Sequence, residues 1–184
     1  FVGIIPARFA STRFPGKPLV DIGGKAMIQR VYEQVSKVLT DVYVATDDQR
    51  IFDAVLAFGG KAIMTSDQHK SGTDRCYEAY SKLTGAFDVV INVQGDEPFI
   101  QPEQIETLKA CFETSNTEIA TLAKRFAEKD GCEALNNSNS PKLVVNKFDE
   151  AMYFSRSIIP FLRGAETADW LSLGSYLKHV GIYA

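Results

Sequence analysis

The first half of the chain alternates short apolar runs with longer segments in which apolar residues recur every three or four positions. The apolar runs have the length of buried strands and lie at residues 2–7, 41–46, 61–64 and 89–93. The segments with helical spacing predict helices at residues 27–38, 51–56, 73–83 and 102–112. This alternation predicts an open, mostly parallel α/β sheet with right-handed crossovers.

Turn and cap residues agree with these helices. Asp47 or Asp48 is suited to cap the second helix, and two consecutive glycines, Gly59 and Gly60, end it. Thr73 is a candidate cap for the third helix, and Pro102 suits the first turn of the fourth.

The pattern changes near residue 117. Apolar runs at residues 118–125, 142–146, 151–155 and 177–183 predict strands with fewer helices between them, and residues 136–140 predict a loop. We therefore expect an α/β part over residues 1–116 and a smaller mixed-sheet extension over residues 117–184. Because the last predicted strand stops at Ala184, we also expect the natural protein to continue beyond it.

Composition narrows the class of protein. The 184 residues are 45% hydrophobic and 23% charged, which excludes intrinsic disorder. A net charge of −3 gives no basic excess for a nucleic-acid backbone, and no apolar run is long enough to predict a membrane span. The three cysteines lie far apart and predict neither a disulfide framework nor a metal knuckle, which favours the reducing cytoplasm.

A cationic loop follows the first predicted strand. Within ten residues it carries three cations and small or hydroxyl-bearing neighbours, namely Arg8, Ser11, Thr12, Arg13, Gly16 and Lys17. Guanidinium and ammonium groups at this density suit a triphosphate. The loop lacks both the Walker spacing and a G-x-G-x-x-G fingerprint. The alternative is an ordinary solvated basic loop.

A second cluster, Gln94-Gly-Asp96-Glu-Pro98, closes the most apolar strand. Asp96 is a natural ligand for Mg²⁺, which uses one or two protein carboxylates together with substrate phosphates. Gln94 is suited to contact a base or a sugar. The alternative for this segment is a simple Gly-Asp turn.

Two further clusters lie elsewhere in the chain. Ser71, Gly72 and Thr73 precede a predicted helix, where backbone N–H groups favour anions, although capping by Thr73 explains the same pattern. In the second part, Arg156 is suited to a substrate carboxylate and His179 to a sugar hydroxyl or a proton. A surface arginine and a satisfied histidine are the alternatives.

The first three clusters fall on one edge of the predicted sheet, since ligands of open α/β sheets bind beyond the carboxyl ends of the strands. Their convergence predicts a nucleoside triphosphate held between Arg and Lys side chains on one side and Mg²⁺ on the other. It does not decide which bond is broken.

Several segments, in this order, resemble the 3-deoxy-manno-octulosonate (Kdo) cytidylyltransferases. They are Ile4–Leu19 with its Pro-Ala-Arg opening, Val44–Asp47, Ser71–Arg75, Asn92–Pro98, Tyr153–Arg156 and His179–Tyr183. The resemblance runs from Phe1 to Ala184. Sialic acid enzymes continue the Pro-Ala-Arg opening with a Gly-Ser-Lys-Gly type of loop, and sugar-1-phosphate enzymes begin with Ala-Ala-Gly. Neither pattern occurs here.

The resemblance implies a Rossmann-like nucleotidyltransferase sheet and cytidylyl transfer from CTP to the 2-hydroxyl of Kdo, giving CMP-Kdo and diphosphate for lipopolysaccharide synthesis. The implied catalytic residues are Arg8, Arg13, Lys17 and Asp96, with Asp96 on Mg²⁺. The implied nucleotide-binding residues are Arg8, Ser11, Arg13, Lys17, Ser71, Gly72, Arg75 and Gln94. The implied sugar-binding residues are Gln94, Arg156, His179 and Tyr183.

The resemblance also implies a homodimer, with residues 117–184 in sugar binding and dimerisation, and a second metal-sharing Asp beyond Ala184. Two other functions stay open. One is a cytidylyltransferase for another acidic sugar, such as 8-amino-Kdo or a sialic acid. The other is a non-catalytic nucleotide-binding module, which has no need of a metal carboxylate opposite a triphosphate loop.

Overall fold

A computed structural model describes residues 1–10, 14–113 and 116–184. The fold divides into two compact units, residues 1–120 with 182–184 and residues 121–181. No helix among the described residues is both long and apolar enough to cross a membrane.

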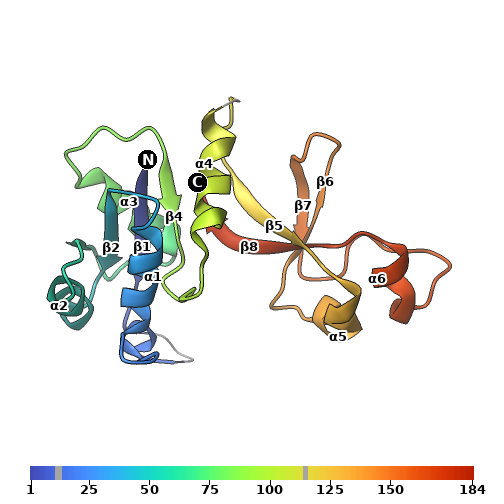
Figure 1. The fold of residues 1–184 in the computed structure, drawn as a ribbon, viewed down its shortest axis with the longest axis horizontal. Coiled ribbons are helices and arrows are strands. Elements are labelled where there is room, and N and C mark those ends of the chain that lie inside the picture. The colour runs from blue at the N-terminus through green and yellow to red at the C-terminus, as the bar shows by residue number, and fades with distance from the viewer. Residues whose placement is uncertain (11–13, 114–115) are drawn as a thin grey trace. The chain divides into compact units, whose positions relative to one another are not determined.

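A parallel sheet forms the centre of the first unit (Figure 1). Its strands are β1 (Val2–Ala7), β2 (Val42–Thr46), β3 (Ala62–Met64) and β4 (Val90–Asn92), in the order β3-β2-β1-β4. β1, β2, β3 and β4 pair in parallel, so all their carboxyl ends share one edge. The end of β8 (Leu177–Tyr183) runs antiparallel to β4, with Tyr183 opposite Asn92. The predicted mostly parallel α/β sheet is confirmed.

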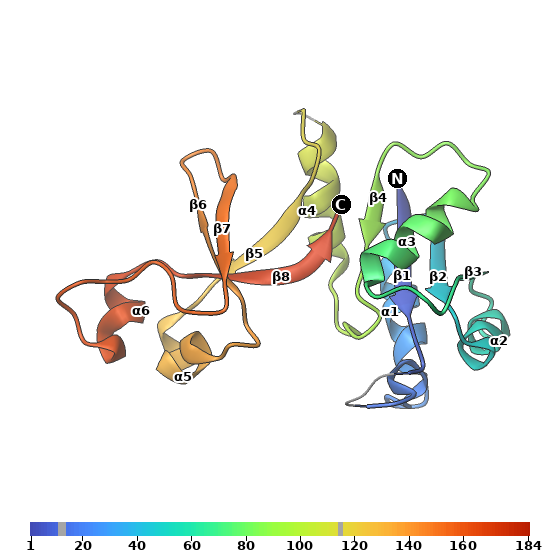
Figure 2. The same ribbon diagram turned by 180° about the vertical axis from the view of Figure 1, so that it is seen from behind.

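Helices cover both faces of β1. The helices of this unit are α1 (Met27–Val35), α2 (Gln49–Ala57), α3 (Gly72–Ser81) and α4 (Pro102–Glu113), with a 3₁₀ turn η1 at Lys17–Leu19. Val2 and Ile4 pack with Cys76 and Ala79 of α3 on one face. Gly3 lies against Val35 at the end of α1 on the other face, and Figure 2 shows α1 and α3 on opposite sides. The strand is therefore apolar along its whole length because neither face reaches water.

All four helices are confirmed, with boundaries that differ from the predictions by up to three residues. The first helix ends at Val35 and not at residue 38, because Ser36–Val38 form turns that close on the last helical carbonyls. The third begins at Gly72, and its cap is Ser71 and not Thr73. The Ser71 hydroxyl accepts a hydrogen bond from the Asp74 N–H at 3.1 Å, which satisfies a donor of the first turn.

The second unit is built mainly from antiparallel strands. They are β5 (Thr121–Arg125), β6 (Lys142–Val145), β7 (Ala151–Ser155) and the first part of β8, with β6 between β7 and β8 and with β5 paired to β8. Short helices not expected from the sequence are α5 (Gly131–Asn136), α6 (Trp170–Leu173), and the 3₁₀ turns η2 (Glu128–Asp130) and η3 (Thr167–Asp169). Phe126, Leu135, Trp170 and Tyr176 form the core of this unit.

One polar atom in this core lacks a partner. Tyr176 is 1% exposed, and its hydroxyl has no hydrogen-bond partner among the described residues. Burial also raises the pKa of Tyr176. A buried hydroxyl without a partner costs about 1–3 kcal/mol, so Tyr176→Phe is expected to raise the free energy of unfolding by about 1 kcal/mol. Urea denaturation measures it.

Tyr77→Phe is the matched control, because Tyr77 is 73% exposed and keeps its hydroxyl in water. Its free energy of unfolding is expected to stay unchanged. A loss of stability in Tyr176→Phe would show that a bound water satisfies the Tyr176 hydroxyl.

Candidate active site

The carboxyl ends of β1 and β4 are neighbours in the sheet, and the loops that follow them carry the predicted phosphate and metal residues. Arg8 directly follows β1, is exposed and has no polar partner among the described residues. Ser11 and Arg13 lie outside the described residues. Lys17 is the first residue of η1.

Phe9 and Gly16 close the loop between β1 and η1. The Gly16 N–H donates to the Phe9 carbonyl oxygen at 2.9 Å. Gly16 has φ +72°, and a Cβ at this position would lie 3.0 Å from the Phe9 ring. A glycine is therefore needed for both the left-handed conformation and the close approach. The turn places Lys17 at the start of a short helix.

Lys17 and Asp96 meet across the two loops. The Lys17 ammonium donates to Asp96 Oδ2 at 2.7 Å. Gly95 makes this approach possible, since a Cβ there would lie 2.8 Å from the Pro6 carbonyl oxygen of β1. The loop after β4 therefore packs directly against the β1 backbone. The two charged segments that the sequence places on one edge do lie together.

This ion pair contributes little to folding. The side chains of Lys17 and Asp96 are 36% and 52% exposed, and exposed pairs stabilise proteins by about 0–1 kcal/mol. Both groups are accessible to a ligand. The described residues contain no cluster of three or more His, Cys, Asp or Glu arranged to hold a metal. Asp96 offers one carboxylate, and Mg²⁺ takes its other ligands from phosphates and water. The predicted metal role of Asp96 stays a prediction.

Arg75 has a different environment from the one expected of a nucleotide ligand. Its side chain is 4% exposed and donates to Asp47 Oδ2 at 2.7 Å and to Thr65 Oγ1 at 2.6 Å. These contacts tie α3 to the ends of β2 and β3. The predicted contact of Arg75 with the nucleotide stays a prediction.

Ser71 and Gly72 lie at the start of α3, near β1. Besides accepting from the Asp74 N–H, the Ser71 hydroxyl donates to Asp74 Oδ2 at 2.7 Å. Gly72 faces Pro6, whose Cγ would lie 3.3 Å from an added Cβ. The helix start is thus packed on the strand that leads into the cationic loop.

Glu78 of α3 holds the segment between β3 and α3. Its carboxylate pairs with Lys82 at 2.6 Å, accepts from the Ser66 N–H at 2.9 Å and contacts His69 Nε2. The Lys82 contact, followed by those of Ser66 and His69, lowers the pKa of Glu78 from 4.5 to about 2. Glu78 therefore stabilises the folded state while it is ionised.

This predicts a pH-dependent contribution of Glu78 to stability. It is fully present above the unfolded pKa of 4.5 and is lost as the pH falls toward the folded value of about 2. Glu78→Gln removes the charge at every pH. Thermal melting of both proteins across this range is expected to show a difference in Tm that closes toward low pH. A constant difference would contradict the prediction.

Gln94 and Tyr183 lie beside Asn92 in the first unit. Gln94 Nε2 donates to Asn92 Oδ1 at 3.3 Å, and Tyr183 is the strand partner of Asn92. Asn92 itself is 8% exposed. Gln94 thus lies just after β4, two residues before Asp96, and Tyr183 is the last residue of the neighbouring strand β8. Their predicted roles stay predictions.

Arg156 and His179, the other predicted sugar-side residues, belong to the second unit. Arg156 is exposed and its Nη1 donates to the Ser138 carbonyl oxygen at 2.7 Å. His179 Nε2 lies 2.9 Å from Thr121 Oγ1, and its ring contacts Phe154 edge-on. Burial lowers the pKa of His179 below 6.5, so the ring is neutral at neutral pH.

The structure adds one cation that the sequence did not single out. The Arg50 guanidinium lies 3.3 Å from the centre of the Phe9 ring. The same guanidinium donates to both carboxylate oxygens of Asp48 at 2.9 and 2.7 Å. Arg50 therefore braces the cationic loop from α2 through Phe9. The sequence holds no signal for this contact, because it depends on how α2 packs beside β2 and η1.

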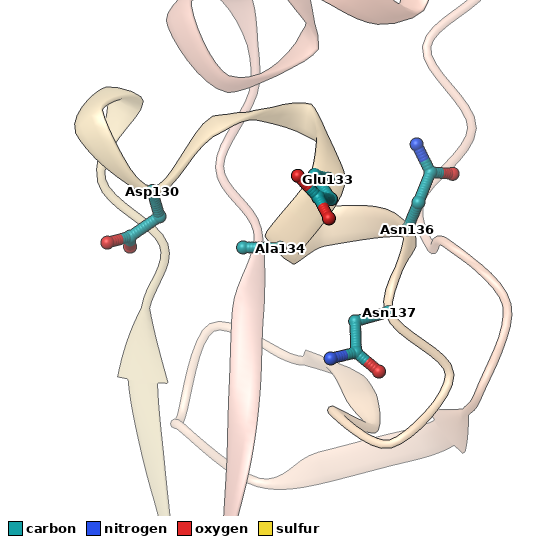
Figure 3. Close-up of a pocket in the computed structure, with 5 residues that line it drawn as sticks. All are labelled: Asp130, Glu133, Ala134, Asn136 and Asn137. Atoms are coloured by element: carbon teal, nitrogen blue, oxygen red, sulfur yellow. The ribbon is translucent and has the colours of Figure 1, made fainter.

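A cavity of about 480 Å³ lies in the second unit (Figure 3). Five residues of α5 and its flanks line it: Asp130, Glu133, Ala134, Asn136 and Asn137. None of them is a predicted site residue. Their carboxylates suit a cation or water better than an acidic sugar.

Comparison with known proteins identifies the family. A family model described as cytidylyltransferase matches residues 2–184. A 3-deoxy-manno-octulosonate cytidylyltransferase from Parabacteroides distasonis is 64% identical over 185 residues, covering 100% of this chain and 74% of its own length. The enzyme of the same name from Phocaeicola vulgatus is 65% identical, covering 100% of this chain and 73% of its own length. The chain belongs to the 3-deoxy-manno-octulosonate cytidylyltransferase family.

One solved structure matches almost the whole length of this cytidylyltransferase chain. It is a CMP:2-keto-3-deoxy-manno-octonic acid synthetase complexed with CTP, with a TM-score of 0.86 and 46% identity. The match covers 99% of this chain and 72% of that one. HddC from Yersinia pseudotuberculosis has a TM-score of 0.63 at 11% identity, over 100% of this chain and 76% of its own, which shows a shared fold alone. The resemblance found in the sequence is confirmed.

Proposed function

We propose that this cytidylyltransferase transfers CMP from CTP to the 2-hydroxyl of Kdo, releasing diphosphate and supplying CMP-Kdo for lipopolysaccharide synthesis. The observation that carries the proposal is the 2.7 Å contact of Lys17 with Asp96 at the carboxyl edge of the sheet. It puts a phosphate-binding cation beside a metal-binding carboxylate. The relatives named as this enzyme support the choice of substrates.

The chemistry is an in-line displacement at the α-phosphorus of CTP. The 2-oxygen of Kdo forms a new bond to phosphorus, the bond to the diphosphate oxygen breaks, and the hydroxyl proton leaves to solvent. Lys17, Arg8 and Arg13 neutralise the negative charge that develops on the diphosphate. Lys17 begins the short helix η1 and is held by Asp96, so its ammonium group is oriented before the substrate arrives.

Mg²⁺ is the proposed cofactor, with Asp96 as its protein ligand in this chain. When bound, the cation supplies Lewis-acid stabilisation of the α-phosphate and favours deprotonation of the attacking hydroxyl. Asp96 suits this role because it lies in the turn that follows the buried strand β4, yet its carboxylate stays 52% exposed. Gly95 fixes the backbone that presents it.

The other site residues divide between the two substrates. Ser71, Gly72 and Arg75 are proposed near the nucleotide, with Gln94 between nucleotide and sugar. Arg156, His179 and Tyr183 are proposed on the Kdo side. His179 is neutral near pH 7, since burial lowers its pKa. It is therefore suited to hydrogen-bond a sugar hydroxyl, and the carboxylate of Kdo is left to Arg156.

We also propose a cytoplasmic homodimer. Strand β7 exposes Met152, Tyr153 and Phe154, at 68%, 64% and 44%, on both of its faces. An exposed apolar strand is a strong candidate for burial in a subunit contact. The cytoplasm is proposed because the three cysteines lie far apart in the sequence and predict no disulfide framework.

A diphosphate-release assay on the full-length enzyme tests the function. CTP is compared with the other nucleoside triphosphates, and Kdo with 8-amino-Kdo and a sialic acid. The highest turnover is expected with CTP, Kdo and Mg²⁺. Preference for another acidic sugar would select the first alternative. Binding of CTP without diphosphate release under any of these conditions would select the non-catalytic module.

A further inference from the structure

Lys142 is a buried cation without a carboxylate partner among the described residues. It is the first residue of β6 and is 0% exposed. Its Nζ donates to the carbonyl oxygens of Asn137 at 3.0 Å, Ser140 at 2.9 Å and Arg156 at 3.1 Å. These bonds use all three donors of the ammonium group. Burying a charge is costly, so its position calls for a reason other than core packing.

The three acceptors show what Lys142 holds. Asn137, at the end of α5 and labelled in Figure 3, and Ser140 belong to the loop before β6, whereas Arg156 directly follows β7. Lys142 and Ser155 are partners in the β6–β7 pairing. One ammonium group therefore fastens the loop to the residue that ends β7.

The side chain of Arg156 is bound to the same loop. Its Nη1 donates to the Ser138 carbonyl oxygen at 2.7 Å. Arg156 is thus held at two points. Its backbone carbonyl accepts from Lys142, and its guanidinium group donates to the loop before β6. Its Nε and Nη2 have no partner within the part of the chain that the structure describes, and the side chain is exposed. The guanidinium is oriented yet still has donors to offer an anion.

We propose that Lys142 is a positioning residue for Arg156 in recognition of the substrate carboxylate. This inference rests on the proposed function, which assigns that carboxylate to Arg156. Lys142 itself is buried and touches no substrate. Lys142 fixes the backbone of Arg156 and also fixes the loop that accepts a hydrogen bond from the Arg156 side chain. In this way it orients the Arg156 guanidinium group.

Steady-state kinetics of the full-length enzyme test the proposal with Lys142→Met, which keeps the length of the side chain and removes its donors. The KM for Kdo is expected to rise about tenfold, as one charge-assisted contact is misaligned, while the KM for CTP stays unchanged. A merely structural role would lower the fraction of active enzyme and leave both KM values unchanged. Lys147→Met, an exposed lysine in the β6–β7 turn, is the control and is expected to change neither KM.

Arg156→Ala separates this proposal from the proposed function. The rise in Kdo KM is expected in Arg156→Ala as well, and adding Lys142→Met to it should raise the KM no further. If Arg156→Ala raises the KM and Lys142→Met does not, or if the two effects multiply, positioning by Lys142 is overturned. If neither variant changes the KM for Kdo, the assignment of Arg156 to the sugar is overturned together with positioning by Lys142. The proposed function is then still supported if the wild-type enzyme turns over CTP and Kdo.

The same kinetics remain decisive if Lys142→Met does not fold. Lys142→Gln retains an amide with two donors, and its Kdo KM is expected between those of the wild type and Arg156→Ala. A folded Lys142→Gln with the wild-type KM would overturn the proposal. In the wild-type enzyme, the Lys142 ammonium protons should give an NMR signal protected from exchange, and rapid exchange would contradict the three hydrogen bonds.

Discussion

Replacing Asp96 by alanine is expected to lower kcat by about 10³-fold and to remove the dependence of the residual rate on Mg²⁺. The carboxylate is the single acidic side chain paired with Lys17, and no described cluster offers a substitute ligand. The fold should stay intact, because Asp96 is half exposed and its ion pair contributes only about 0–1 kcal/mol. Diphosphate release over a range of Mg²⁺ concentrations measures the effect, with circular dichroism as the test of folding.

Asp88→Ala is the matched control for Asp96. It removes an exposed carboxylate just before β4, at the opposite end of the strand from Asp96. Its kcat and Mg²⁺ dependence should equal those of the wild type. Turnover at the wild-type level in Asp96→Ala would refute the assignment of Asp96 to the metal.

Replacing Lys17 by alanine is expected to lower kcat by about 10²- to 10³-fold, because the charge that stabilises the leaving diphosphate acts mainly in the transition state. The KM for Kdo should change little, since Lys17 is proposed to contact the phosphates of CTP and not the sugar. Lys17→Arg keeps the charge and should retain part of the rate. Single-turnover kinetics at saturating CTP separate the chemical step from binding.

Lys37→Ala is the corresponding control. Lys37 is an exposed lysine just after α1, and within the described part of the chain its Nζ donates to Gln34 alone. No change in kcat is expected. A variant of Lys17 in which only the KM for Kdo rises would place this lysine at the sugar and would require a different phosphate ligand.

Much of the first unit could be predicted from the sequence, because its strands and helices differ in period and length. β1 was found because both of its faces are buried and every position is apolar or small. Parallel pairing then placed Lys17 and Asp96 at one edge, since both follow carboxyl ends of neighbouring strands. The order of elements was enough for this inference.

Contacts that depend on side-chain packing between elements could not be predicted. The burial of Arg75 against Asp47 and Thr65 has no signal in the sequence, which gives Arg75 only as one of several polar residues at the start of a helix. The stack of Arg50 on Phe9 joins residues whose proximity follows only from the packing of α2. The short helices of the second unit carry too few turns for a periodic pattern, so α5 and α6 escaped detection.

The central position of β1 in the sheet determines how the first unit unfolds. Its backbone amides are bonded to strands on both edges, and its side chains are covered by helices on both faces. Such a strand exchanges its amide hydrogens with solvent only when the whole unit opens. The start of the loop that carries Arg8 and Lys17 therefore shares the global stability of its unit, and this part of the loop should stay folded on heating until the whole unit melts cooperatively.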